Sequence, residues 1–180
     1  MARAFLLGSL TSLLRRLPPA SVKLVAFNLD QQQEIFRDSD FDRTGLYRLS
    51  EALNKLELGT ISYKQLEDGF GWADLLSGLV REEAESALPP DAVVLLGPTN
   101  RINARIPDEF LASSRRKQLP FFYFEYYPMH GREFPDAIER VTDVRNGKTY
   151  RLYSPGDLAQ SIAQMEKTLE RGDRAVRMTQ

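Results

Sequence analysis

The chain contains no cysteine, which excludes disulfides, thiolate metal sites and cysteine nucleophiles. It also lacks an excess of either charge, because 24 basic and 25 acidic residues give a formal net charge of -1. There is therefore no basic field to attract nucleic acid or an anionic membrane surface. The phosphate-loop, dinucleotide-binding, serine-hydrolase and zinc-protease motifs are all absent. These absences disfavour nucleic-acid binding, a nucleotide cofactor and the enzyme classes that those motifs mark.

Candidate catalytic residues are few. The single histidine, His130, lies in a Pro-Met-His-Gly-Arg segment, where a lone histidine is more often a surface residue than a general base. A hydrolase that uses His130 with Asp136 or Asp30 stays open as an alternative, although no motif supplies its nucleophile. Several acidic residues fall at helical spacings, which indicates solvated helix faces rather than paired carboxylates. These residues are Glu82, Glu83, Glu85, Asp136 and Glu139.

The N-terminal apolar stretch, residues 4–14, is too short to cross a bilayer. It is followed by Arg15 and Arg16, where a signal peptide would have a small, neutral cleavage region. Leucines recur with the spacing of one helix face at Leu6, Leu7, Leu10, Leu13, Leu14 and Leu17. We favour a packed amphipathic helix over a short signal peptide, and we expect no membrane insertion.

The rest of the chain alternates short apolar runs with helical patterns. Runs typical of strands, buried or alternating, lie at 21–29, 92–97, 119–127 and 148–154. Helical patterns cover 2–17, 44–57, 72–87, 134–143 and 155–171. This order predicts a single α/β domain over residues 1–171, with α/β/α layers around a mostly parallel sheet. The polar tail at 172–180 is expected to fray.

Two local signals are sharper than the rest. Ser154 and Pro155 are typical of a helix start, with Asp157 placed near the positive helix end. Asn146-Gly147, just before the alternating strand, indicates a tight turn. Both signals predict where the last strand begins and where the last helix follows it.

The segment DFDRTGLYRLSE, residues 40–51, has the ligand spacing of a helix–loop–helix calcium loop. Its ligand and turn positions are Asp40, Asp42, Thr44, Gly45 and Glu51. Phe36 lies four residues before the loop, as an incoming helix would require, but Ser39 replaces the usual apolar residue and no second such loop exists. We favour the alternative that Asp42 or Thr44 caps a helix carrying Leu46, Leu49, Leu53 and Leu56.

The order of segments carries a family resemblance. The strand-like SVKLVAFN leads into QQQEIFR, then a helix and LELGTISYKQL, and the helical WADLLSGLVREE leads into PPDAVVLLGPTNR. FFYFEYYP, FPDAIERV and GKTYRLYSPGDLAQSIAQME follow. This order resembles a von Willebrand factor A-type domain, most closely the divergent A-like domains of large bacterial, notably acidobacterial, secreted or membrane-associated proteins. The resemblance covers residues 3–170 and rests on element order, not on an active-site string.

Competent members of that family bind a divalent cation through a DxSxS loop after the first strand, a threonine on a second loop and an aspartate after the fourth strand. The resemblance implies that the first strand and its DxSxS loop are missing here, because the chain begins at the first helix. It also implies that Gly97-Pro98 stands where the aspartate would be. Thr60 could replace the threonine, but one neutral hydroxyl does not hold Mg²⁺. We expect no metal site and no cofactor.

The missing strand has a structural consequence. In the family fold it lies between the strands formed here by VKLVAF and AVVLLG. Without it, these two strands must close the gap or keep unpaired backbone groups. Three explanations are open: a fragment of a larger protein, which we favour, a short protein that pairs the two strands directly, or a protein that takes a strand from a partner.

The expected function is non-enzymatic protein binding through loops at the carboxyl-terminal edge of the sheet, where α/β proteins place ligands. These loops carry the aromatic, methionine and arginine residues that are enriched at interface centres. The residues expected to contact a partner are Asn28, Asp30, Thr99, Asn100, Arg101, Tyr127, Met129, His130 and Arg132. The sequence leaves the partner, the process and the oligomeric state open. The compartment is extracytoplasmic if a longer parent chain carries a signal peptide upstream, and cytoplasmic otherwise.

Overall fold

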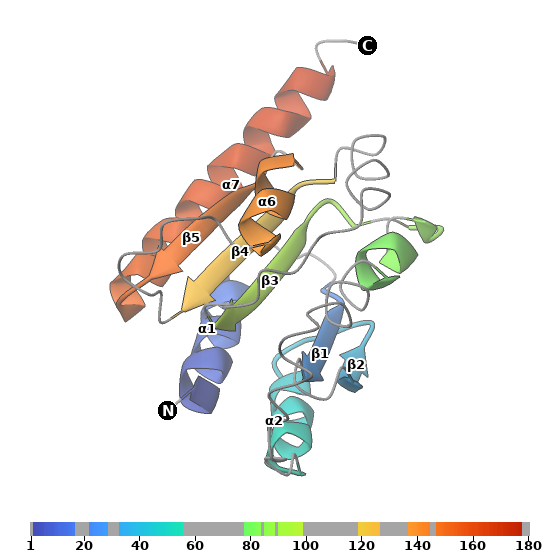
Figure 1. The fold of residues 1–180 in the computed structure, drawn as a ribbon, viewed down its shortest axis with the longest axis vertical. Coiled ribbons are helices and arrows are strands. Elements are labelled where there is room, and N and C mark those ends of the chain that lie inside the picture. The colour runs from blue at the N-terminus through green and yellow to red at the C-terminus, as the bar shows by residue number, and fades with distance from the viewer. Residues whose placement is uncertain are drawn as a thin grey trace.

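Figure 1 shows the computed structural model of the chain, which describes residues 2–16, 22–28, 33–55, 78–83, 85–88, 90–98, 119–126, 137–144 and 147–177. In chain order its elements are α1 (Ala2–Arg16), β1 (Leu24–Asn28), β2 (Gln33–Asp38), α2 (Gly45–Lys55), β3 (Val93–Pro98), β4 (Phe121–Tyr126), α6 (Ala137–Val144), β5 (Lys148–Leu152) and α7 (Pro155–Arg177). Residues 78–83 and residue 85 are also helical and belong to the helix predicted at 72–87.

The parallel sheet has the strand order β3-β4-β5. β4 lies in its centre, and all six residues of this FFYFEY strand are buried. β5 alternates buried and exposed residues, as an edge strand that is covered more fully on one face than on the other does. The sequence therefore predicted these strands and their parallel pairing.

Helices cover both faces of this sheet. Alternate side chains of a strand point to opposite faces. On β4, Phe122, Phe124 and Tyr126 share one core cluster with Leu13 of α1 and with the buried face of α7. On the opposite face α6 packs against β4 and β5, and its Thr142 hydroxyl lies 3.1 Å from that of Thr149 on β5. The central strand is buried because both of its edges and both of its faces are occupied.

The first predicted strand does not join this sheet. β1 instead pairs antiparallel with β2 in a separate two-stranded sheet, with a bulge between Ala26 and Phe27. The connection, residues 29–32, is short enough for a hairpin, whereas a parallel crossover needs a dozen or more residues. The segment QQQEIFR, which the sequence placed between a strand and a helix, thus contributes β2. The hypothesis that the chain pairs the 24–28 and 93–98 strands directly is wrong, since they lie in separate sheets.

Helix α1 contributes to two cores. Its Phe5 and Leu13 pack with β4, β5, α7 and the β3 residue Leu96. Its Leu6, Leu7, Leu10 and Leu14 pack with β1, β2 and α2 around the buried Phe41, Leu49 and Leu53. The predicted packed helix is confirmed, and its leucines divide between two neighbouring clusters. In Figure 1, α1 accordingly lies behind the ends of β3 and β4, with α2 beside it.

The helix boundaries differ from the sequence expectation mainly at the C-terminus. α7 begins at Pro155, as predicted, but continues to Arg177 rather than ending at residue 171. The predicted polar tail at 172–180 therefore starts as part of this helix, and its fraying stays a prediction. Gly147, before β5, confirms the need for glycine at the predicted turn, because a Cβ there would lie 1.7 Å from the Phe121 carbonyl oxygen.

Candidate functional site

The carboxyl edge of the parallel sheet is the region where the sequence predicted partner contacts. The last residues of the three strands, Pro98, Tyr126 and Leu152, are level with one another in the strand register. All three chain segments therefore leave the sheet at the same edge. We call this edge, with the residues immediately beneath it and those that follow β5, the carboxyl edge.

A buried charge group lies one residue below this edge. Glu125 of β4 is only 1% exposed and is the register partner of Arg151 on β5. The Arg151 Nε lies 3.5 Å from Glu125 Oε2, while its Nη2 donates a hydrogen bond to Glu139 Oε1 of α6. The guanidinium thus connects the central strand to the helix that covers it. Buried carboxylates are stable only with such partners.

The electrostatics of this group are dominated by the carboxylates. Burial lowers the pKa of Arg151, but the nearby charges of Glu139 and Glu125 and the hydrogen bond to Glu139 outweigh it, so that the pKa is raised overall. Arg151 therefore stays charged, with half of its side chain exposed to solvent. The next residue but one, Tyr153, is 60% exposed. An arginine held in one orientation beside an exposed tyrosine is suited to recognition at a protein surface.

The first turn of α7 lies at the same edge. Asp157 Oδ2 accepts hydrogen bonds from the backbone N–H groups of Ser154, at 2.7 Å, and Tyr153, at 2.9 Å. The hydrogen bond from the Ser154 backbone is the largest of the causes that lower the pKa of Asp157. The predicted helix start at Ser154 and Pro155 is confirmed, and the acid three residues after Ser154 closes a capping arrangement. This cap holds Tyr153 in a defined position.

Most of the predicted partner-contact residues lie outside the part of the chain that the structure describes. Asn28 ends β1, and its strand belongs to the antiparallel pair rather than to the parallel sheet. The others lie outside the described residues: Asp30, Thr99, Asn100, Arg101, Tyr127, Met129, His130 and Arg132. Asp136 and Thr60 also lie outside the described residues. The hydrolase alternative and the threonine of the A-type family therefore stay predictions.

Sequence reasoning missed the charge group. Glu139 was expected on a solvated helix face, but it is 6% exposed because α6 turns it toward the sheet and Arg151. Glu125 is the one acidic residue in an aromatic run of the sequence. An ionised side chain in a buried strand needs a cationic partner, so this acid could have indicated a buried ion pair. Only the strand register identifies that partner as Arg151.

The 40–51 loop caps a helix. Asp42 Oδ1 accepts hydrogen bonds from the Thr44 hydroxyl at 2.6 Å and from the backbone N–H groups of Thr44 and Gly45. The Thr44 hydroxyl is the main cause of the lowered pKa of Asp42. The preceding element is the strand β2, which carries Phe36, and not the incoming helix of a calcium loop. Glu51 accepts a hydrogen bond from Tyr47 instead of turning toward the loop acids. The favoured alternative, a capped helix, is confirmed.

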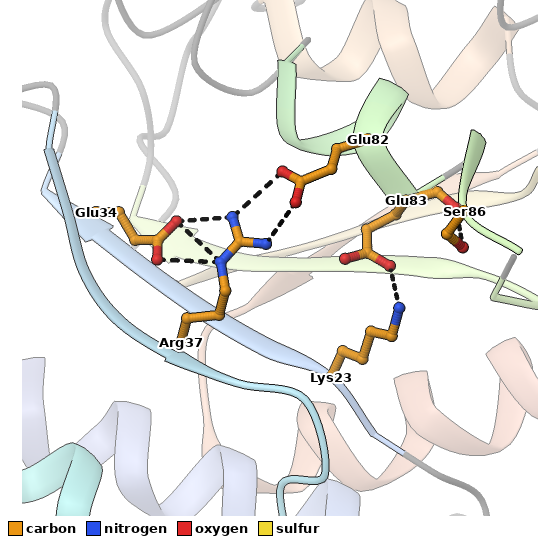
Figure 2. Close-up of polar contacts among 6 residues, drawn as sticks. All are labelled: Lys23, Glu34, Arg37, Glu82, Glu83 and Ser86. Carbon is orange, nitrogen blue, oxygen red and sulfur yellow. Dashed lines mark hydrogen bonds and ion pairs between the residues drawn. The ribbon is translucent and has the colours of Figure 1, made fainter. Parts of the chain in front are cut away.

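A second polar group, shown in Figure 2, joins the β1–β2 hairpin to the segment before β3. Arg37 of β2 lies between Glu34 on its own strand, at 2.8 Å, and Glu82 on the 78–83 helix, at 2.9 Å. Lys23, just before β1, donates to Glu83 Oε2 at 2.8 Å. The hydrogen bond to Arg37 lowers the pKa of Glu34, and hydrogen bonding to Glu34 raises that of Arg37. Glu82 and Glu83, expected only to be solvated, each have a cationic partner in the hairpin.

Within the part of the chain that the structure describes, no three histidine or acidic residues are grouped so that they could hold a metal ion. None of the described helices is long and apolar enough to span a membrane. Comparison with known proteins gives neither a matching family model nor a matching curated protein.

Proposed function

We propose that this chain is a non-enzymatic protein-binding module with an A-like, three-layer α/β/α architecture, and that it contacts its partner through the carboxyl edge. The observation that carries this proposal is the alignment of three strand ends over the Glu125–Arg151–Glu139 group, beside the exposed Tyr153. The parallel sheet and the helices on its two faces support the architecture. The element order that resembles the A-type family supports it as well.

The carboxyl edge combines a rigid base with exposed contact residues. Arg151 is oriented by two carboxylates, so part of the entropy that a flexible arginine loses on binding is already lost. Tyr153 offers a large contact area with few rotatable bonds, and tyrosine and arginine are frequent hot-spot residues. The segment after Tyr126 carries Tyr127, Met129 and Arg132, which extend the same composition along the chain. We propose a partner surface that presents acidic and aromatic groups to this edge.

The test compares two exposed tyrosines. A binding partner is isolated from the organism's own proteins with the full chain as bait, purified, and titrated by calorimetry against the wild type and two variants. Tyr153→Ala is expected to weaken binding at least about tenfold, the range of a moderate hot spot. Tyr47→Ala is the matched control, because Tyr47 is 70% exposed but lies on α2.

The arginines at the edge give a second measurement. Arg132→Ala and Arg151→Lys are expected to weaken the same titration, while both variants keep the wild-type circular dichroism spectrum. Equal affinity for the wild type, Tyr153→Ala and Arg132→Ala would contradict binding at the carboxyl edge. A loss that appears with Tyr47→Ala alone would place the interface on α2 instead.

A further inference from the structure

The two outer strands of the parallel sheet differ in a way that the proposed function does not explain. β5 carries Lys148 and Arg151, both exposed, and charged side chains are a usual protection of a free sheet edge. β3, at the other end of the strand order, has the sequence VVLLGP without any charged residue. An uncharged apolar edge strand is a template for pairing with another strand. Among the described strands, only β4 pairs with β3.

The burial of β3 also departs from its composition. A strand that is apolar on both faces is typical of the centre of a parallel sheet. β4 meets this expectation, but none of the residues 93–97 on β3 is buried, and Val94 is 37% exposed. The side chains of β3 therefore have the chemistry of an interior strand and the exposure of an outer one.

The backbone register shows which groups face outward. The Val93 N–H donates to the Pro120 carbonyl oxygen at 2.9 Å, so this residue bonds toward β4. In a parallel strand successive residues direct their N–H and C=O groups to opposite sides. The N–H and C=O groups of Val94 and Leu96 therefore point toward the outer edge of β3.

Figure 1 shows a second apolar strand, β1, on the side of β3 away from β4. β1, with the sequence LVAFN, pairs with β2 along one edge only among the described strands. Residues of β1 share a cluster with α1, and Leu96 of β3 packs in the other cluster to which α1 contributes. α1 therefore borders both strands, β1 through one cluster and β3 through the other.

Two ion pairs hold the hairpin near this position. Figure 2 shows Lys23, at the entrance to β1, bonded to Glu83, and Arg37 of β2 bonded to Glu82. Both acids belong to the segment that leads into β3. A second whole sheet, such as β3 of another copy, would have to displace the hairpin and break these contacts, whereas one inserted strand would not.

We infer that the outer edge of β3 accepts one extended, uncharged, apolar strand of a partner protein. The inserted strand pairs with the outward groups of Val94 and Leu96, and its length matches the six residues of β3. Its side chains are apolar on both faces, because Leu96 packs in the cluster that includes Leu13 of α1, Val94 lies on the same face of the strand, and the opposite face carries Val93 and Leu95. This inference concerns a different part of the molecule from the carboxyl edge and does not depend on the proposed function.

Amide hydrogen exchange of the full chain tests the free edge directly. The amides of Val94 and Leu96 are expected to exchange rapidly, while those of Val93 and Leu95 are protected by β4. Equally slow exchange at all four amides in a monomer would overturn the inference, because another segment of the same chain would then pair with the edge. Slow exchange at Val94 and Leu96 that appears only in a dimer would overturn it in favour of a second copy.

The occupant is tested with a synthetic strand. The probe is a blocked peptide with a central run of valine, isoleucine and threonine matched to β3 in length, with lysines at both ends for solubility. It is expected to slow exchange at Val94 and Leu96 by at least about tenfold. The control peptide has prolines in the central run, which remove ladder donors. Failure of the first peptide to protect these amides, or equal protection by the control, would overturn the inference.

A pair of variants localises the contact. Val94→Lys places a charge on the exposed edge and is expected to abolish the protection by the peptide, whereas Val94→Thr keeps a neutral, β-branched residue and retains it. Since Val94 is exposed, both variants are expected to melt as cooperatively as the wild type. Protection that survives Val94→Lys in a cooperatively folded chain would show that the peptide binds elsewhere.

Discussion

β3 and β4 are neighbours in one sheet and are both almost entirely apolar, yet the side chains of β4 are buried and those of β3 are partly exposed. Phe121, Phe122, Tyr123 and Phe124 of β4 are 0% exposed, while Val94 of β3 is 37% exposed. β4 has a strand on each side and helices over both faces. β3 has a described strand on one side only. Both strands have an apolar composition, and the number of strands and helices that pack against each strand determines how deeply its side chains are buried.

This difference shows how a core and a binding edge arise from similar sequences. A strand with apolar side chains on both faces gains its full hydrophobic stabilisation only when both edges and both faces are covered. β4 has already gained it within the chain. β3 has gained only part of this stabilisation, and an added strand could provide the rest. Substitutions made in one element at a time test this difference between β3 and β4.

The largest effect is expected from the buried aromatic of β4. Phe124 is fully buried, and its ring centroid lies 5.1 Å from that of Tyr150. Phe124→Ala is expected to lower the free energy of unfolding by about 3–5 kcal/mol, through lost burial and a cavity. Val94→Ala, the matched change on β3, is expected to cost less than about 1 kcal/mol. Urea denaturation measures both, and equal losses would contradict the difference between the strands.

The next effect is expected from the charge group under the carboxyl edge. Arg151→Ala leaves the buried Glu125 and Glu139 without their guanidinium. It is expected to cost about 1–3 kcal/mol of stability, since removal of the half-exposed Arg151 side chain lets water reach the carboxylates and compensate in part. Arg48→Ala is the control, because Arg48 is 57% exposed and bonds to Asp38 outside this sheet. The control is expected to cost at most about 1 kcal/mol. Similar denaturation midpoints for both variants would argue against a structural role for the buried group.

A smaller effect with a defined pH dependence is expected at the start of α7. The lowered pKa of Asp157 means that its carboxylate stabilises the fold above the ordinary value of 3.8, and that this contribution is lost as the pH falls through the lower pKa of the folded state. Asp157→Ala is therefore expected to melt at a lower temperature at pH 7, with a difference from the wild type that shrinks in acid. Asp157→Asn keeps an accepting oxygen and should lose less. A difference that is constant with pH would exclude the charged cap.

The smallest effect is expected from the exposed ion pairs beside β3. A double-mutant cycle on Arg37 and Glu82 should give a coupling of about 0.2–1 kcal/mol that weakens in high salt. The cycle on Arg37 and Glu34 is the control, because Glu34 lies on the same strand and does not connect the hairpin to the segment before β3. If the Glu82 variant changes the protection of the Val94 amide by the peptide and the Glu34 variant does not, the position of the hairpin controls the open edge of β3. Identical behaviour of the two cycles would remove that link.

Local chemistry was predictable where neighbours in the sequence are also neighbours in space. The start of α7 at Pro155 and the cap of α2 by Asp42 depend on residues within three positions of one another. The pairing of β4 with β5 followed from two apolar runs separated by a helix, which is the pattern of a parallel unit. The antiparallel pairing of β1 was missed, because its apolar run cannot be distinguished from a parallel-sheet strand by periodicity.

The amino-acid sequence alone predicted the mixed α/β character and most of the helices and strands, since these depend on composition and on local periodicity, although it missed β2. The contact of Glu125 with Arg151, the burial of Glu139 and the membership of β1 and β3 in separate sheets emerged from the folded structure. The reason is that strand register and sheet membership are set by contacts between distant segments. Such contacts depend on which faces and edges remain uncovered once the local elements have formed.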